Sequence, residues 1–169
     1  MTQVLPALDE SQLSRLLGAC QRIIFKPEAE WSQEALHLVR PDNLPASPGG
    51  PLRWTQQTIS QIEAARFNWL VMRTMKYLRK SADHKVKQVS DEVLRAGVYK
   101  WLKAAAAYGV NQEAAFRKWS YLQVVTGGRL ETPLGLRDFM AASEPVPNPN
   151  EKVAMIMRES IYDRGVFHM

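Results

Sequence analysis

Two long segments of this chain place their apolar residues at the spacing of an α-helix, and this periodicity limits the fold more than any other feature. Within residues 55–80, and again within residues 90–108, apolar side chains recur every three or four positions and form one stripe along a helix. The stripes contain Phe67, Leu70, Val71, Met75 and Leu78 in the first segment, and Leu94, Val98, Trp101, Leu102 and Ala105 in the second.

Capping and terminating residues predict additional helices on both sides of these segments. Polar residues or prolines that favour a first helical turn precede each one, and glycines or prolines follow. No stretch shows sustained alternation of apolar and polar residues between turn signals, and no repeat of 20–50 residues is found. The sequence therefore predicts an all-α fold, a single-domain helical bundle of about six or seven helices. The predicted starts are Asp9 or Ser11, Pro27, Thr55, Ser90, Asn111, Thr132 and Asn150, and the predicted ends are Phe25, Lys80, Tyr108, Val125, Ala142 and Gly165.

One segment, residues 40–54, interrupts the helical pattern with four prolines and a glycine pair. Prolines remove backbone donors and helical geometry, so this segment is expected to be a loop or linker. We divide the chain accordingly into an N-terminal helical hairpin at residues 1–39, the Pro/Gly-rich segment 40–54 and a main helical bundle at residues 55–169. The segment is either a loop that wraps the domain or a hinge between hairpin and bundle.

The residue types needed for catalysis or metal binding are scarce. The 169 residues include one cysteine, Cys20, and three scattered histidines, which cannot form a structural zinc site or an internal disulfide. Cys20 falls in the first predicted helix, so we expect it to be a buried small hydrophobe. No phosphate-binding glycine loop, nucleophile elbow or paired-histidine spacing is present. We therefore predict a non-enzymatic protein with no cofactor and no metal.

The N-terminus lacks the basic flank and apolar run of a signal peptide, and no apolar stretch approaches the roughly 20 residues of a membrane span. The expected location is the cytoplasm, without membrane association.

Positive charge is concentrated in the middle of the chain. Residues 55–103 carry ten basic and four acidic side chains, whereas the flanking segments are close to neutral. On the first long helix, several of these cations share one side with a tryptophan, opposite the apolar stripe. Ammonium and guanidinium groups neutralise phosphates, and an indole can stack on a base. This basic-aromatic face contains Arg66, Trp69, Arg73, Lys76 and Lys80, and the second long helix adds Lys100 and Lys103.

The junction of the next two helices has some features of a helix-turn-helix. Small residues precede Gly109, and an apolar residue and Asn111 follow it, which is typical of two helices in close crossed contact. In that interpretation Gln112, Glu113, Arg117 and Lys118 would enter a major groove.

The leading hypothesis is thus a nucleic-acid-binding protein, with DNA as the expected partner, that uses the basic-aromatic face and the helical hairpin. One alternative is that the face is merely solvated, with Trp69 packed beneath arginine stems. The other is a protein-protein interaction or adaptor module, which would use exposed apolar positions of the C-terminal helix to dock a protein partner or form a homo-oligomer.

Overall fold

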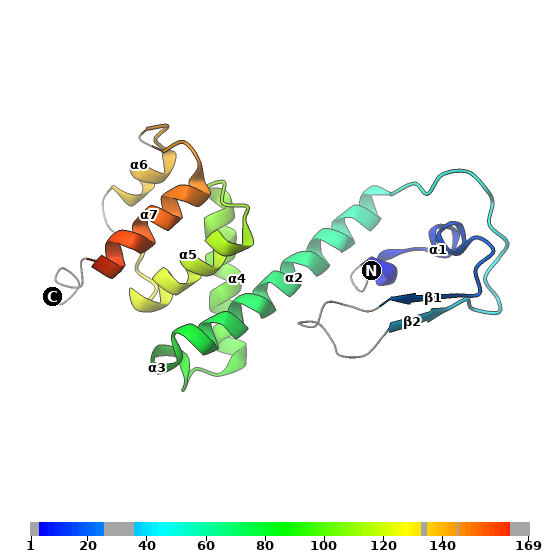
Figure 1. The fold of residues 1–169 in the computed structure, drawn as a ribbon, viewed down its shortest axis with the longest axis horizontal. Coiled ribbons are helices and arrows are strands. Elements are labelled where there is room, and N and C mark those ends of the chain that lie inside the picture. The colour runs from blue at the N-terminus through cyan, green and yellow to red at the C-terminus, as the bar shows by residue number, and fades with distance from the viewer. Residues whose placement is uncertain (1–3, 26–35, 133–134, 145, 163–169) are drawn as a thin grey trace. The chain divides into compact units, whose positions relative to one another are not determined.

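The computed structural model describes residues 4–25, 36–132, 135–144 and 146–162, and most of these residues are helical (Figure 1). This confirms the predicted all-α fold class. The only sheet among them is a two-stranded antiparallel hairpin. In chain order the elements are the 3-10 turn η1 (Leu5–Ala7), α1 (Glu10–Leu17), β1 (Arg22–Phe25), β2 (Leu36–Val39), α2 (Gln56–Ser81), α3 (Asp83–Val86), α4 (Asp91–Ala107), α5 (Glu113–Val125), α6 (Leu136–Ala141) and α7 (Pro149–Tyr162).

The chain forms two compact units, Met1–Phe67 and Asn68–Met169, and the division falls inside α2. In the first unit, the proline-rich segment is fastened to α1. The hydroxyl of Ser14 donates to the carbonyl of Pro45 at 2.8 Å, and the guanidinium of Arg15 donates to the carbonyl of Pro51 at 2.9 Å. Proline lacks an N–H but keeps its carbonyl, so these side chains bind the groups that the prolines leave unused.

The first predicted helix ends earlier than expected. Its N-terminus is a capping box, in which the Gln12 N–H donates to Asp9 Oδ1 at 2.8 Å, but α1 stops at Leu17. Gly18 follows with φ at +55°, a conformation that glycine adopts at little cost. The prediction of helix up to Phe25 is therefore wrong.

The β1–β2 hairpin occupies part of the region predicted to be a helical hairpin. Ile23 and Ile24 are β-branched residues that favour strands, and they pair with Leu38 and His37. Cys20 lies between α1 and β1 and is exposed, so the prediction of a buried thiol is also wrong. The helix predicted to start at Pro27 falls in residues 26–35, outside the described residues.

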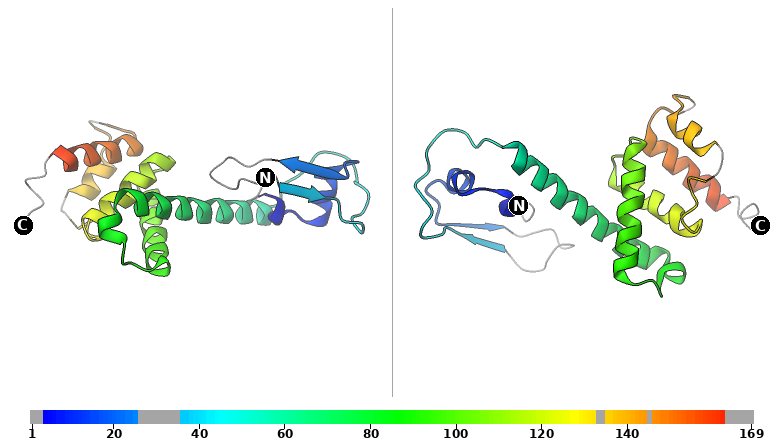
Figure 2. Two further views of the ribbon diagram at one scale, coloured as in Figure 1. Left: turned by 60° about the horizontal axis from the view of Figure 1, so that its bottom comes forward. Right: turned by 180° about the vertical axis from the view of Figure 1, so that it is seen from behind.

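In the second unit, α5 lies between α4 and α7, as the views of Figures 1 and 2 agree. Trp119 in the middle of α5 is fully buried, and its ring centroid lies 5.5 Å from that of Tyr108 at the end of α4. Ala115, Phe116 and Leu122 are buried along the same helix. Helix α5 thus supplies much of the core of this unit.

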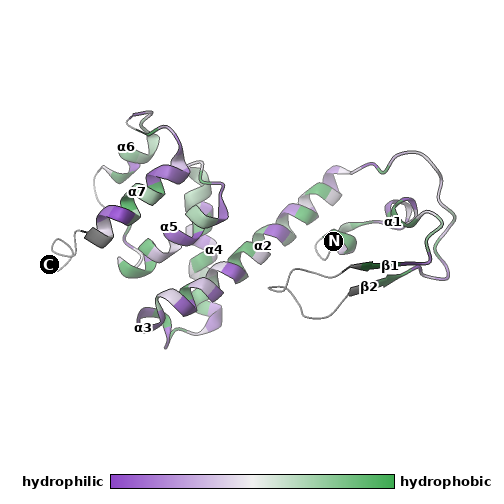
Figure 3. Ribbon diagram, in the orientation of Figure 1, coloured by the Kyte–Doolittle hydropathy of each residue, from purple (hydrophilic) through white to green (hydrophobic). Residues whose placement is uncertain are grey.

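The predicted apolar stripes lie largely in the core. Figure 3 shows hydrophilic and hydrophobic residues interleaved along α2, as expected of an amphipathic helix. Trp101 differs from the prediction, because it is only partly buried and lies against Gly97, at the edge of the α4 stripe. The buried members are Val71, Met75, Leu78, Leu94, Val98, Leu102 and Ala105, and Phe67 and Leu70 are partly exposed.

Two predicted helix caps are confirmed. The Thr58 N–H donates to Thr55 Oγ1 at 3.1 Å at the start of α2, and the Val93 N–H donates to Ser90 Oγ at 3.3 Å at the start of α4. Helix α6 starts at Leu136 and not at Thr132, and the predicted end of α7 at Gly165 lies beyond the described residues.

The predicted caps of α5 and α7 are wrong, and the contacts that replace them connect the two helices. Asn111 does not cap α5. Instead, Oδ1 of Asn150 in α7 accepts hydrogen bonds from the backbone N–H groups of Asn111 at 3.1 Å and Gln112 at 3.0 Å. Asn150 does not cap its own helix, where Asn148 Oδ1 accepts the Asn150 N–H at 3.0 Å. The buried Asn150 amide also donates to Asn111 Oδ1 and Asn148 Oδ1, each at 3.0 Å. One side chain therefore joins the starts of both helices.

We expect Asn150→Ala to lower the free energy of unfolding by about 1–2 kcal/mol, because it leaves two backbone N–H groups at the α5 start without their side-chain acceptor. Asn150→Asp keeps an acceptor at this position and should cost less. Chemical denaturation of both variants checks this, with exposed Asn68→Ala as the control. Equal loss in the Ala and Asp variants would contradict the capping role.

Candidate nucleic-acid interface

The basic residues of α2 lie on the side of the helix that faces away from its buried stripe. At about 100° per residue, the positions of Arg66, Lys76 and Lys80 fall opposite Val71 and Leu78. These three cations are exposed, whereas Val71 and Leu78 are fully buried. Arg66 belongs to the first unit, and both lysines belong to the second.

Arg73 and Trp69, predicted on the same face, interact with each other. The Arg73 guanidinium carbon lies 4.3 Å from the centroid of the Trp69 ring, a cation-π geometry. Both residues are partly buried. One face of the indole is therefore covered by an arginine of the same helix, which limits the surface that remains for a stacked base.

Arg73 is also part of an ion cluster that joins α2 to α5. Its Nε lies 3.0 Å from Glu113 Oε1, and the same oxygen accepts from Arg117 Nη2 at 2.5 Å. The Arg117 guanidinium lies 5.9 Å from the centroid of the Tyr77 ring on α2. Two cations of the predicted interface are thus held by one carboxylate.

Sequence reasoning placed Glu113 among the groove residues and missed its role in this ion cluster. The i,i+4 spacing of Glu113 and Arg117 predicts their pairing on a helix. No sequence pattern connects Arg73 to a glutamate forty positions away.

A third arginine, Arg79 of α2, holds the segment between α3 and α4. It donates to the carbonyls of Val86 and Val89, and its Nη2 lies 2.7 Å from Asp91 Oδ1. The three arginines in the second-unit part of α2 and in α5 therefore all contact carboxylates in this unit.

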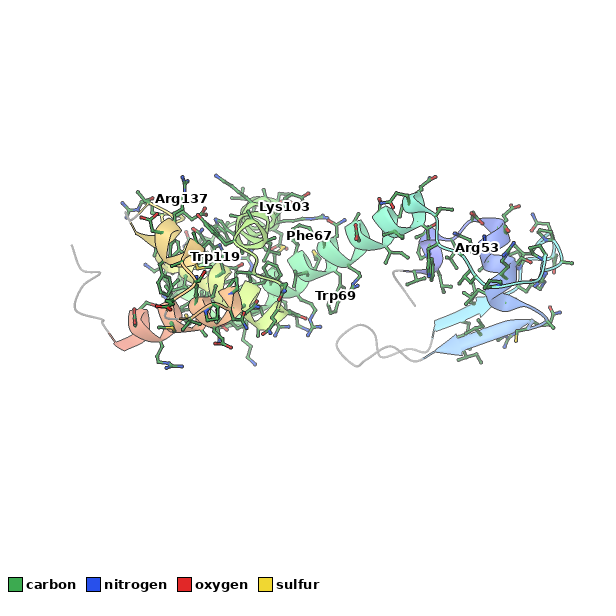
Figure 4. All side chains as sticks on the ribbon, turned by 90° about the horizontal axis from the view of Figure 1, so that it is seen from above. Arg53, Phe67, Trp69, Lys103, Trp119 and Arg137 are labelled. Atoms are coloured by element: carbon green, nitrogen blue, oxygen red, sulfur yellow. The ribbon has the colours of Figure 1, made fainter. Side chains whose placement is uncertain are left out.

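Four lysines of the predicted interface are exposed. Lys76 and Lys80 of α2 and Lys100 and Lys103 of α4 are exposed, and Figure 4 shows Lys103 on the outside of its helix. Lys103 Nζ lies 5.8 Å from the centroid of the Tyr99 ring. We call these four residues the outer lysines.

The helical hairpin of α4 and α5 has the close crossed contact that the sequence predicted. Gly109 turns the chain at φ +83°, and the N–H of the buried Val110 donates to the carbonyl of Ala105 at 3.1 Å. The sides of α5 are covered by α4 and α7, with Trp119 enclosed between them (Figure 4). Of the predicted groove residues, Gln112 is exposed and Lys118 is partly exposed.

The described residues contain no group of three or more His, Cys, Asp or Glu side chains arranged to hold a metal ion. None of the helices in the described part combines the length and apolar character that a membrane span requires.

The Glu113 cluster yields a stability prediction. We expect Glu113→Gln to lower the free energy of unfolding by about 1–2 kcal/mol, because two partly buried guanidinium groups lose a shared anion. Exposed Glu159→Gln on α7 removes the same charge without a described partner and should cost less than about 0.5 kcal/mol. Urea denaturation of both variants checks this, and equal effects would show that the cluster does not stabilise the unit.

Comparison with known proteins adds no relative, because no family model, no curated protein and no solved structure matches this chain.

Proposed function

We propose that this chain is a non-enzymatic, cytoplasmic nucleic-acid-binding protein that contacts the phosphates of duplex DNA through the outer lysines. The observation that supports this most directly is the different placement of the arginines and the lysines of these helices. The arginines of α2 and α5 in the second unit pair with carboxylates, while Lys76, Lys80, Lys100 and Lys103 stay on the surface.

The chemistry of lysine supports a phosphate contact. An ammonium group on a flexible stem is a compact point charge that suits the backbone of a nucleic acid without reading its sequence. The field is reinforced by the exposed Lys85, Lys87 and Arg95 in the same third of the chain. A localised positive field of this kind attracts polyanions and speeds their association.

The other predicted residues contribute less to the proposed interface. Arg73 and Arg117 have a structural role through Glu113, and Trp69 is the support on which Arg73 lies. Arg66 adds an exposed positive charge to the first unit, and in the second unit Gln112 and Lys118 are available for additional contacts. Because the proposed contacts join lysine ammonium groups to phosphates, which carry no sequence information, the expected binding is of low sequence specificity.

The proposal predicts a specific salt dependence. Each phosphate contact that is lost reduces the slope of log affinity against log salt by about 0.9 for duplex DNA. The double variant Lys76→Gln, Lys80→Gln should therefore flatten the slope by nearly two units with little change in stability. Fluorescence anisotropy with a short labelled duplex, repeated at several salt concentrations, measures this.

The matched control is Arg137→Gln, Arg158→Gln, which removes two exposed charges from α6 and α7. The net charge changes equally, so the control separates local contacts from overall electrostatic attraction. An equal change in slope for both pairs would remove the outer lysines from the interface. Absence of binding to DNA or RNA at low salt would overturn the proposed function.

A protein-interaction module remains the second candidate, and one observation favours it. Val93 and Tyr99 of α4 are 65% and 45% exposed, and Met72 of α2 is 52% exposed. Large exposed apolar side chains are common at interfaces between proteins. Self-association detected by sizing chromatography, and unaffected by salt, would support this candidate over nucleic-acid binding.

A further inference from the structure

An open cavity of about 230 Å³ lies in the second unit, among residues of α3, α4 and α5. Apolar side chains form most of its wall, where Val86 is buried, Trp101 is partly buried and Val93 is 65% exposed. Gly127 and Gly128, which follow α5, also line the cavity and are exposed. The cavity is therefore apolar and accessible from solvent.

The volume of the cavity limits what can fill it. Pockets that enclose drug-sized molecules hold about 300–1,000 Å³, and this cavity is smaller. An occupant that enters through an exposed mouth can remain attached to a larger molecule outside. The size and the openness together favour a side chain that belongs to a partner protein.

The exposure of Val93 supports an apolar side chain as the occupant. Val93 lies at the start of α4 beside the partly buried Trp101 and Val124, so an apolar group in the cavity would cover several apolar surfaces at once. Removal of such surfaces from water favours association. A bulky side chain seated in a pocket of the partner is the usual anchor of a protein interface.

The charges around the cavity indicate what should flank this anchor. Lys85 of α3 is exposed, and it is the one charged residue among the described residues that line the cavity. Residues directly next to lining residues in the sequence add four exposed cations and one exposed carboxylate. Exposed charges act over about 8–10 Å at moderate salt, so this surroundings attracts acidic groups and repels basic ones. The cations are Lys87, Arg95, Lys100 and Arg129, and the carboxylate belongs to Glu92.

We infer that this cavity docks an acidic segment of a partner protein, which inserts one bulky apolar side chain between α3, α4 and α5. Phosphates alone would match the cations but leave the apolar wall in water, whereas an acidic segment with an apolar anchor matches both. None of the outer lysines is among the described residues that line the cavity. The inference therefore goes beyond the proposed nucleic-acid binding and does not depend on it.

Three short peptides with blocked ends test the two requirements on the full chain. The first has a central leucine with two aspartates on each side, the second has alanine in place of leucine, and the third has asparagines in place of the aspartates. For the first peptide we expect a dissociation constant in the millimolar range, because a single small anchor must offset the cost of association. Two-dimensional amide NMR titration measures the affinity and identifies the residues whose signals move.

The two altered peptides should differ from the first in distinct ways. The alanine peptide should bind about tenfold more weakly, because it buries much less apolar area. The asparagine peptide should bind more weakly at low salt, and its affinity should not change with salt concentration.

Two variants, each with a matched control, assign these contacts to residues. Lys85→Gln should weaken the acidic leucine peptide and spare the asparagine peptide, whereas Lys76→Gln, at an exposed lysine outside the described lining, should have little effect on either. Val93→Ser should weaken both leucine-containing peptides. Its control is Val39→Ser, which changes an exposed valine of the first unit and should leave binding unchanged.

The expected result is that the acidic leucine peptide shifts the signals of lining residues and binds more tightly than both altered peptides. Absence of binding by this peptide would overturn the inference, and so would equal affinities of the leucine and alanine peptides. A short single-stranded oligonucleotide of thymidines is titrated as the alternative occupant. If it shifts the lining signals and the peptide does not, the cavity takes a base and the inference is wrong. The peptide comparison on the unmodified chain decides the matter even if a variant fails to fold, which its unbound NMR spectrum shows.

Discussion

The second unit of this protein depends on the burial of α5 between α4 and α7. The first backbone N–H groups of a helix have no partner within the helix, so other groups must accept from them. Asn150 does this from α7, and it simultaneously contacts the polar side chains of Asn111 and Asn148. The packing of α5 and the polar contacts at its start therefore depend on each other.

Arginine and lysine take different places on α2 of the second unit. Arginine presents several donors in a rigid planar fork, so it can bind a carboxylate, a carbonyl and a ring at once, whereas lysine is a more strongly hydrated point charge. Arg73, Arg79 and Arg117 accordingly make the contacts that connect α2 with α4 and α5. In the second-unit part of α2, Lys76 and Lys80 are therefore the cations that stay exposed. This is why the proposed phosphate contacts rest on lysines.

One lysine of the second unit is buried, and backbone carbonyls stabilise its charge. Lys152 of α7 is 1% exposed, and its Nζ donates to the carbonyls of Met140 at 2.9 Å and Ala142 at the end of α6. An ammonium group at the C-terminus of a helix satisfies carbonyls that have no helical partner and complements the helix dipole. Gln123 contrasts with it, since one of its polar atoms has no partner at all.

Local sequence patterns predicted the helical class, the positions of α2, α4 and α5, and the caps at Thr55 and Ser90, because these depend on contacts between residues three or four positions apart. It also identified the exposed lysines, since a helical wheel separates buried from exposed positions. The prediction failed for the apolar residues after Gly18, which fit either a helix or a strand. Their pairing with Leu36–Val39 makes them a strand. The tertiary structure alone decided that Asn150 caps α5, that Arg73 meets Glu113 and that Gln123 lines a cavity. Each of these is a contact between residues brought together by packing or a space left by it, and no local periodicity specifies such contacts.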